Sequence, residues 1–230
     1  MRVAATVASA LAILFCVRPA QAFDCLARAT EHIENKDQEA ATAAVKRGAR
    51  EGDARCKFIL GMWLLAGAKS PEDPETGLRW LKSAAKDGLP AAQSVLGLLY
   101  ASGVGVERND EAAVRWYRAA AEYGDPLGQS ALGLATFLGV GIEEDRISAY
   151  QWTSLAAAQG DQKALTHLPT IENTLTPSEL QQAKQNVARF RPKERKGQRR
   201  PSTKQLLRVV GLNRTPGEIE RFFGFGGADR

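Results

Sequence analysis

An internal repeat of 36 residues in the middle of this 230-residue chain constrains its fold more than any other feature. Three columns of residues recur at that spacing: Gly61, Gly97 and Gly133; Trp80, Trp116 and Trp152; and Gly88, Gly124 and Gly160. Three independent columns with one period exclude coincidence, and periods of roughly 20–50 residues are typical of solenoids and other repeat arrays. The fold can therefore be predicted one 36-residue repeat unit at a time.

Each repeat unit is predicted to hold two helices. The first helix, as in residues 91–102, presents a broad apolar face and stops at a glycine pair such as Gly103 and Gly105. The second helix ends at the last glycine column and starts at a capping side chain, in the column Asp73, Asn109 and Asp145. The first glycine column lets neighbouring helices approach closely. The tryptophan column is predicted to fill core volume; a ligand-stacking ladder is the alternative, but strict repeat spacing favours packing.

Two stretches of the second unit, residues 91–106 and residues 116–124, carry a family resemblance. They resemble the Sel-one-like repeat family, a tetratricopeptide-like group of αα-hairpin repeats. The resemblance implies an all-α, right-handed α-solenoid that acts mainly as an adaptor for protein complexes. The turn after the first helix of the first unit lacks the second glycine, so the resemblance is weaker there.

The repeats set the domain organisation. Three units are predicted at residues 55–90, 91–126 and 127–165, preceded by a degenerate N-terminal half-repeat or cap at residues 23–54. Thr176, Pro177 and Glu179 match a capping box with proline at the first helical position, which predicts a capping helix within residues 166–190. A solenoid must cover its last apolar face, and this helix is expected to do so.

Residues 1–22 are predicted to be a secretory signal. Arg2 gives a positive start, residues 3–17 are apolar, and Ala20 and Ala22 fit the small-residue cleavage rule, so cleavage is expected after Ala22. An uncleaved anchor is the alternative, but the apolar stretch is shorter than the roughly 18–20 residues a membrane span needs. The mature protein is therefore expected to be periplasmic or secreted.

Removal of the signal leaves two cysteines, Cys25 and Cys56, in an oxidising compartment. A disulfide between them is expected, with two free thiols as the alternative. The bridge would join the degenerate N-terminal unit to the first full repeat.

The C-terminal region has a different charge from the repeats. Residues 191–230 hold eleven Lys or Arg against four acids, whereas the repeats are net acidic. Residues 191–204 are predicted to be a basic linker; a solvated run with no dedicated partner is the favoured interpretation, and binding of an anionic envelope polymer or lipid headgroups, or contact with the acidic solenoid, are the alternatives. The candidate polyanion-binding residues are Arg191, Lys193, Arg195, Lys196, Arg199 and Arg200. Residues 205–230 are predicted to be a short helical or disordered tail, with two apolar stretches that either dock onto the solenoid or bind a partner or a membrane surface.

A polar column of Lys57, Gln93 and Gln129 near the starts of the first helices is the candidate partner-binding surface, with plain solvent exposure as the alternative. No catalytic constellation is expected. Only two histidines are present, and the acidic run Glu143, Glu144 and Asp145 falls at a helix start, where carboxylates meet the helix dipole favourably.

The sequence thus predicts an exported, non-catalytic scaffold that mediates protein–protein interactions in the bacterial envelope, with no cofactor, no metal and no nucleic acid. The alternative is an envelope-binding module that acts through the basic tail. An envelope hydrolase is a minor alternative.

Overall fold

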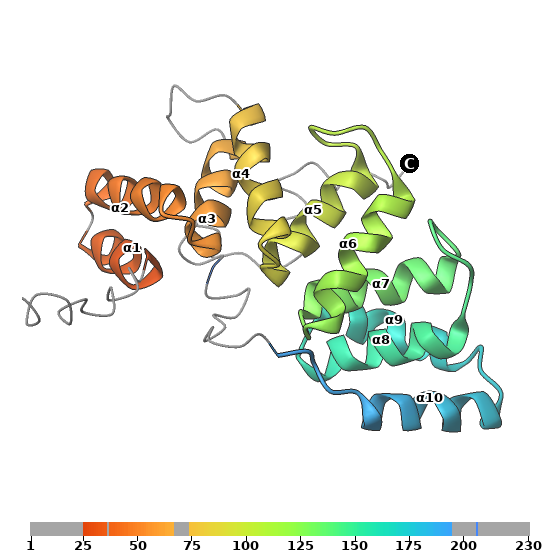
Figure 1. Cartoon of the computed structure of the whole chain (residues 1–230). Helices are drawn as coiled ribbons and strands as arrows, with labels where there is room; N and C mark the ends of the chain where they lie inside the picture. Colours follow the sequence, from red (N-terminus) through yellow and green to blue (C-terminus); the bar gives the residue numbers. More distant parts are fainter. Residues whose placement is uncertain (1–24, 36, 67–73, 195–205, 207–230) are drawn as a thin grey trace, which may run out of the picture.

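The computed structural model describes residues 25–35, 37–66, 74–194 and 206, and within these ranges every regular element is an α-helix (Figure 1). The helices are α1 (Cys25–Glu34), α2 (Gln38–Arg50), α3 (Ala54–Leu65), α4 (Pro74–Lys86), α5 (Pro90–Ser102), α6 (Asp110–Glu122), α7 (Pro126–Leu138), α8 (Arg146–Ala158), α9 (Gln162–Glu172) and α10 (Pro177–Arg189). The signal peptide prediction for residues 1–22 lies outside the described residues.

The helices form a chain of hairpins that runs from α1 to α10 (Figure 1). Within each repeat the first helix packs against the second, as in α3 with α4, α5 with α6 and α7 with α8. Each second helix then packs against the next first helix. The first helices α5, α7 and α9 also contact one another in sequence, so they form an inner layer. The predicted α-solenoid is confirmed.

The glycine column of the first helices lies where the two helices of a hairpin cross. A Cβ on Gly61 would lie 2.9 Å from the backbone oxygen of Gly77 and 2.9 Å from the backbone nitrogen of Leu81, both in α4. A Cβ on Gly133 would lie 2.9 Å from the backbone nitrogen of Thr153 in α8. The close approach predicted from these glycines is therefore present in the hairpins.

The side chains that cap the helix N-termini recur at the repeat spacing for both helices of a unit. Asn109 and Asp145 cap α6 and α8 as predicted, accepting hydrogen bonds from Ala112 N at 2.7 Å and Ser148 N at 3.0 Å; Asp73 lies outside the described residues. A second aspartate column, Asp53, Asp125 and Asp161, caps the first helices α3, α7 and α9. The glycines that follow α4, α6 and α8 have φ of 77°, 82° and 81°, the left-handed conformation that ends a helix.

The tryptophan column lies at the edge of the core. Trp80, Trp116 and Trp152 are half-buried and pack against the core clusters, while smaller side chains such as Leu81, Leu96 and Leu132 form the fully buried interior. The reason is that close helix crossing at the glycine column leaves no interior space for an indole. The prediction that tryptophans fill the core is thus only partly right.

The two ends of the repeat array are covered differently. At the N-terminal end α1 and α2 form a hairpin that packs on α3, with Ala44 buried at the position that holds tryptophan in the full repeats. At the C-terminal end α10 packs on α8. Its predicted capping box is present, because Thr176 Oγ1 accepts from Glu179 N at 3.3 Å and Thr176 N donates to Glu179 Oε2 at 2.8 Å.

The chain after α10 returns along the solenoid. Phe190 meets Trp152 edge-on, with ring centroids 5.4 Å apart. Lys193 N then donates to Glu122 O at 2.8 Å, and its ammonium pairs with the Glu122 carboxylate at 2.5 Å. Leu206 is fully buried in the core cluster formed by α1 to α5. At Leu206, the predicted docking of the apolar tail is therefore present.

Candidate interaction surfaces

The predicted partner-binding column is internal. Gln129 is fully buried and Gln93 is 6% exposed, so neither lines a binding groove or a solvent-exposed face. Lys57 is closer to the surface but pairs with Asp87 Oδ2 at 2.6 Å. The assignment of these residues to an exposed partner surface is wrong.

The glutamines join neighbouring repeats. Gln93 Nε2 donates to Ala85 O at 3.2 Å, and Gln129 Nε2 donates to Ala121 O at 3.3 Å. Both acceptors lie in the last turn of the preceding second helix, where they also accept hydrogen bonds from Gly88 N and Gly124 N at 2.9 Å. Gln93 and Gln129 thus occupy equivalent positions, and each adds a hydrogen bond to a carbonyl of the preceding repeat.

A second contact joins positions 30 residues apart in the first and third units. Lys57 pairs with Asp87 in the first unit, and Gln159 Nε2 donates to Gln129 Oε1 at 2.8 Å in the third. In the second unit the equivalent positions are Gln93 and Tyr123, and the Gln93 Oε1 atom is buried without a hydrogen-bond partner. In the first and third units the column thus links the start of the first helix to the end of its own second helix.

An apolar groove lies on the inner layer between α5 and α7, with a volume of about 220 Å³. Its walls come from α5, α6 and α7, with apolar side chains that include Leu98, Tyr117, Ala131, Leu134, Ala135 and Leu138. Val140 continues the wall from the turn after α7, and Lys163 of α9 and Asp110 of α6 reach the rim. Leu138 is 58% exposed and Val140 is 39% exposed, so a hydrophobic surface faces solvent here.

The groove exists because the repeats are unequal at two positions. Val95 and Leu99 of α5 are fully buried, whereas the equivalent positions of α7, 36 residues later, hold Ala131 and Ala135, which are half-buried. The smaller side chains leave the space between α5 and α7 unfilled. Leu98 and Leu134, which occupy equivalent positions 36 residues apart, are large apolar side chains at the edges of the groove.

A second hollow opens on the other side of α7, between α6 and α8. This cleft of about 560 Å³ is lined by Arg118, Thr136, Trp152 and the acidic run 143–145. Thr136 stands 36 residues after Tyr100, which packs against two core clusters in the preceding unit. The Thr136 hydroxyl donates a hydrogen bond to Leu132 O, one turn earlier in α7, at 2.8 Å.

The acidic run has the structural role predicted for it. Asp145 caps α8, and its carboxylate also accepts from the Ser148 hydroxyl at 2.6 Å. Glu144 pairs with Arg146 at 2.8 Å, and this hydrogen bond raises the pKa of the Arg146 guanidinium. Within the part of the chain that the structure describes, no group of three or more His, Cys, Asp or Glu side chains is placed to hold a metal ion.

Two of the candidate polyanion-binding residues contact the fold itself. Arg191 donates to Ala188 O at 2.8 Å and to Phe190 O at 2.7 Å. Lys193 pairs with Glu122, and the hydrogen bond that its ammonium donates to that carboxylate raises the pKa of the lysine. The other four residues, Arg195, Lys196, Arg199 and Arg200, lie outside the described residues, so the predicted polyanion site there stays a prediction.

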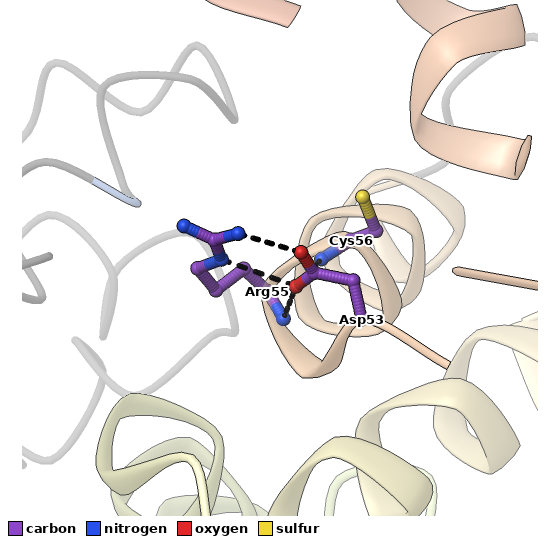
Figure 2. Close-up of polar contacts among 3 residues, drawn as sticks. All are labelled: Asp53, Arg55 and Cys56. Atoms are coloured by element: carbon purple, nitrogen blue, oxygen red, sulfur yellow. Dashed lines mark hydrogen bonds and ion pairs between the residues drawn. The ribbon is translucent and has the colours of Figure 1, made fainter. Parts of the chain in front are cut away.

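The start of α3 holds Cys56 in a fixed position (Figure 2). The Asp53 carboxylate accepts from Arg55 N at 2.8 Å and from Cys56 N at 3.4 Å, and it pairs with the Arg55 guanidinium at 2.7 Å. Cys56 is buried and disulfide-bonded. The side chain of Cys25 lies outside the described residues, so its role as the partner stays a prediction.

Sequence reasoning missed the apolar groove. Its signal was available, since the apolar face of residues 91–102 is wider than packing against one neighbour requires, and Leu98 and Leu134 repeat at the 36-residue spacing. The reduction from Val95 to Ala131 and from Leu99 to Ala135 was also visible in the alignment of the units. The partner-binding surface was instead predicted at the polar column of Lys57, Gln93 and Gln129.

The fold and the inner groove define an α-solenoid repeat protein. Residues 54–89, 90–125 and 126–161 match the Sel1 repeat, in units that begin one residue before the predicted ones. A Sel1 repeat protein from Oxalobacter formigenes is 38% identical over 55% of this chain and 95% of its own, with a TM-score of 0.53. The chain belongs to the Sel1 repeat family.

A second solved structure extends the similarity beyond the three repeats. The c5321 protein of uropathogenic Escherichia coli, a protective antigen with an SLR fold, is 27% identical over 78% of this chain, with a TM-score of 0.61. The match covers 37% of that longer protein. Comparison with curated proteins found no match. Among the described helices, none has the length and apolar character needed to cross a membrane.

Proposed function

We propose that this chain is an exported, non-catalytic scaffold that binds a protein partner in the bacterial envelope through the α5–α7 groove. The observation that carries the proposal is the groove itself, because its walls expose apolar side chains on the inner layer of a repeat family that generally mediates protein–protein interactions. The signal-like residues 1–22 and the disulfide-bonded Cys56 support an oxidising, exported location.

The proposal is tested by crosslinking the mature protein, residues 23–230, in the envelope of its own cells and identifying the captured proteins. Leu138→Asp places a charge on the groove wall and is expected to reduce capture of the partner at least tenfold. Leu165→Asp is the matched control, because Leu165 is also an exposed leucine, at 47%, but does not line the groove.

The two variants separate a groove-specific partner from general surface adhesion. Equal capture by wild type, Leu138→Asp and Leu165→Asp would refute the groove as the partner site. Loss of capture in both variants would also refute it, since only one of them changes the groove. Circular dichroism of each variant establishes that the fold is retained.

A further inference from the structure

The cleft between α6 and α8 opens at a position where the preceding repeat has a tyrosine. Thr136 lines the cleft, and its counterpart 36 residues earlier is Tyr100. Tyr100 and Trp116 pack against the same core cluster, and Trp116 is the counterpart of the cleft residue Trp152. We propose that this cleft binds an aromatic side chain of a cationic segment in a partner protein. The proposal goes beyond the α5–α7 groove, because it assigns a second site with a different occupant.

The second repeat is a valid guide to the occupant because the two units share their backbone here. Asn109 N donates to Tyr100 O at 2.8 Å, and Asp145 N donates to Thr136 O at 3.2 Å. In each unit the donor residue then caps the helix that follows. The second repeat therefore shows that a phenol ring is compatible with a position of this kind.

The cleft has apolar walls that suit such a ring. Leu132, Ile142 and Trp152 line it. Phe190 packs edge-on against the Trp152 indole, with ring centroids 5.4 Å apart, so the indole is held in position. Paired aromatic rings stabilise a contact beyond the area that they bury. The cleft volume of about 560 Å³ lies within the roughly 300–1,000 Å³ of small-ligand pockets, which leaves room for a ring and the peptide atoms beside it.

The charges that line the cleft favour a cation beside the ring. The acidic run 143–145 supplies three carboxylates, and Arg118 supplies the only positive charge among the described residues that line the cleft. Glu144 already pairs with Arg146, whereas no described residue pairs with Glu143. A lysine or arginine next to the partner's aromatic residue would therefore meet a net negative surface, and acidic neighbours would be repelled.

The loop that carries the acidic run is fixed against α6. Gly141 has a φ of 67°, and a Cβ on it would lie 2.9 Å from the backbone nitrogen of Glu111 in the first turn of α6. The loop backbone thus packs directly on that helix. The walls of the cleft are accordingly formed before a ligand binds, which lowers the entropic cost of binding.

The proposal is tested by titrating three capped peptides into the mature protein, residues 23–230. The peptides carry Lys-Tyr-Lys, Lys-Ala-Lys or Glu-Tyr-Glu between glycines. Binding is followed by NMR through the indole N–H signal of Trp152, and the signal of Trp116, the equivalent tryptophan of the second repeat, is the internal control. We expect Lys-Tyr-Lys to shift only the Trp152 signal. It should bind about tenfold more tightly than Lys-Ala-Lys, which lacks the ring, and about fivefold more tightly than Glu-Tyr-Glu, which reverses the charge.

Two variants assign the binding to the cleft. Thr136→Tyr supplies the ring that Tyr100 has in the second repeat and is expected to weaken Lys-Tyr-Lys about tenfold or more, because it fills the space. Glu143→Lys is expected to weaken the same peptide about threefold, since exposed charges contribute modestly. Glu107→Lys is the matched control and should leave the affinity unchanged, because Glu107 is the exposed glutamate at the equivalent position of the second repeat.

Each other outcome overturns the proposal. Absence of binding, or tighter binding of Lys-Ala-Lys, would exclude an aromatic occupant, and tighter binding of Glu-Tyr-Glu would assign the cleft to an acidic ligand of Arg118. Equal weakening by Glu143→Lys and Glu107→Lys would show a response to overall charge and not to the cleft. This comparison still decides if Thr136→Tyr does not fold, which circular dichroism establishes. The outcome is independent of the groove, because Leu138 does not line the cleft.

Discussion

Leu206 provides the sharpest test of how the C-terminal segment contributes to the fold. Its side chain is fully buried in a cluster of residues from α1 to α5, although Leu206 lies 107 positions after Leu99, the last α5 residue of that cluster. Replacing a fully buried leucine with alanine costs about 2–5 kcal/mol, depending on how far the site collapses. We therefore expect Leu206→Ala to lower the free energy of unfolding of the N-terminal half by an amount in this range.

The loss in the free energy of unfolding cannot exceed what the docked C-terminal segment contributes to stability. If alanine weakens the contact by more than the docking of the segment is worth, the segment detaches and no further stability is lost. Deletion of residues 195–230 measures that limit, so Leu206→Ala must not destabilise more than the deletion does. Both are measured by urea unfolding, with circular dichroism for all helices and tryptophan fluorescence for Trp63 and Trp80, which pack on the same cluster.

Leu138→Ala is the control for the chemical change. It removes the same atoms from a side chain that is 58% exposed, and surface substitutions usually change stability by less than about 0.5 kcal/mol. If Leu206→Ala and Leu138→Ala shift the unfolding curve equally, Leu206 is not a core residue and the reasoning on the C-terminal anchor is refuted.

Three further changes test the repeat architecture. Gly133→Ala would bring a Cβ to 2.9 Å from the backbone nitrogen of Thr153, so we expect a loss of about 1–3 kcal/mol in urea unfolding; no loss would mean that α7 and α8 can separate freely. Thr136→Tyr copies Tyr100 and fills the cleft, so a gain of about 0.5–2 kcal/mol is expected, and a loss would show that the units are not equivalent there. The backbone hydrogen bond from the residue that caps α10 lowers the pKa of Glu179, so its stabilising effect is present above the ordinary pKa of about 4.3 and is lost as pH falls through the lowered value. The protection factors of the amides in the first turn of α10, which are corrected for the intrinsic pH dependence of hydrogen exchange, should therefore fall at low pH in the wild type and change little with pH in Glu179→Gln.

The helices were predictable because each of their signals is local. Asn109 and Asp145 cap the helices that follow them, and a glycine with positive φ ends each second helix, because capping depends on residues within one turn. Repetition then strengthened each signal, since one pattern occurred in register three times. The solenoid could accordingly be predicted from sequence alone.

The roles of the polar column were not predictable in the same way. A glutamine near a helix start usually faces solvent, and nothing adjacent to Gln129 in sequence shows that Ala121 O and Gln159 will surround it. Its burial depends on the carbonyls of the preceding repeat, which lie eight residues away in sequence but across a helix junction in space. The groove was missed for a related reason, because it is a difference between two units and not a feature of either.

The groove and the cleft have one cause. The third unit carries smaller side chains than the second at positions that face its neighbours: Ala131 and Ala135 open the groove toward α5, and Thr136 opens the cleft toward α6. An ideal repeat array would be filled equally at every junction, since each unit would present the same surfaces to the next. The proposed partner site therefore lies where the units differ, at the junction of the second and third repeats. Substitutions that restore the residues of the second unit should close that site while leaving the solenoid intact.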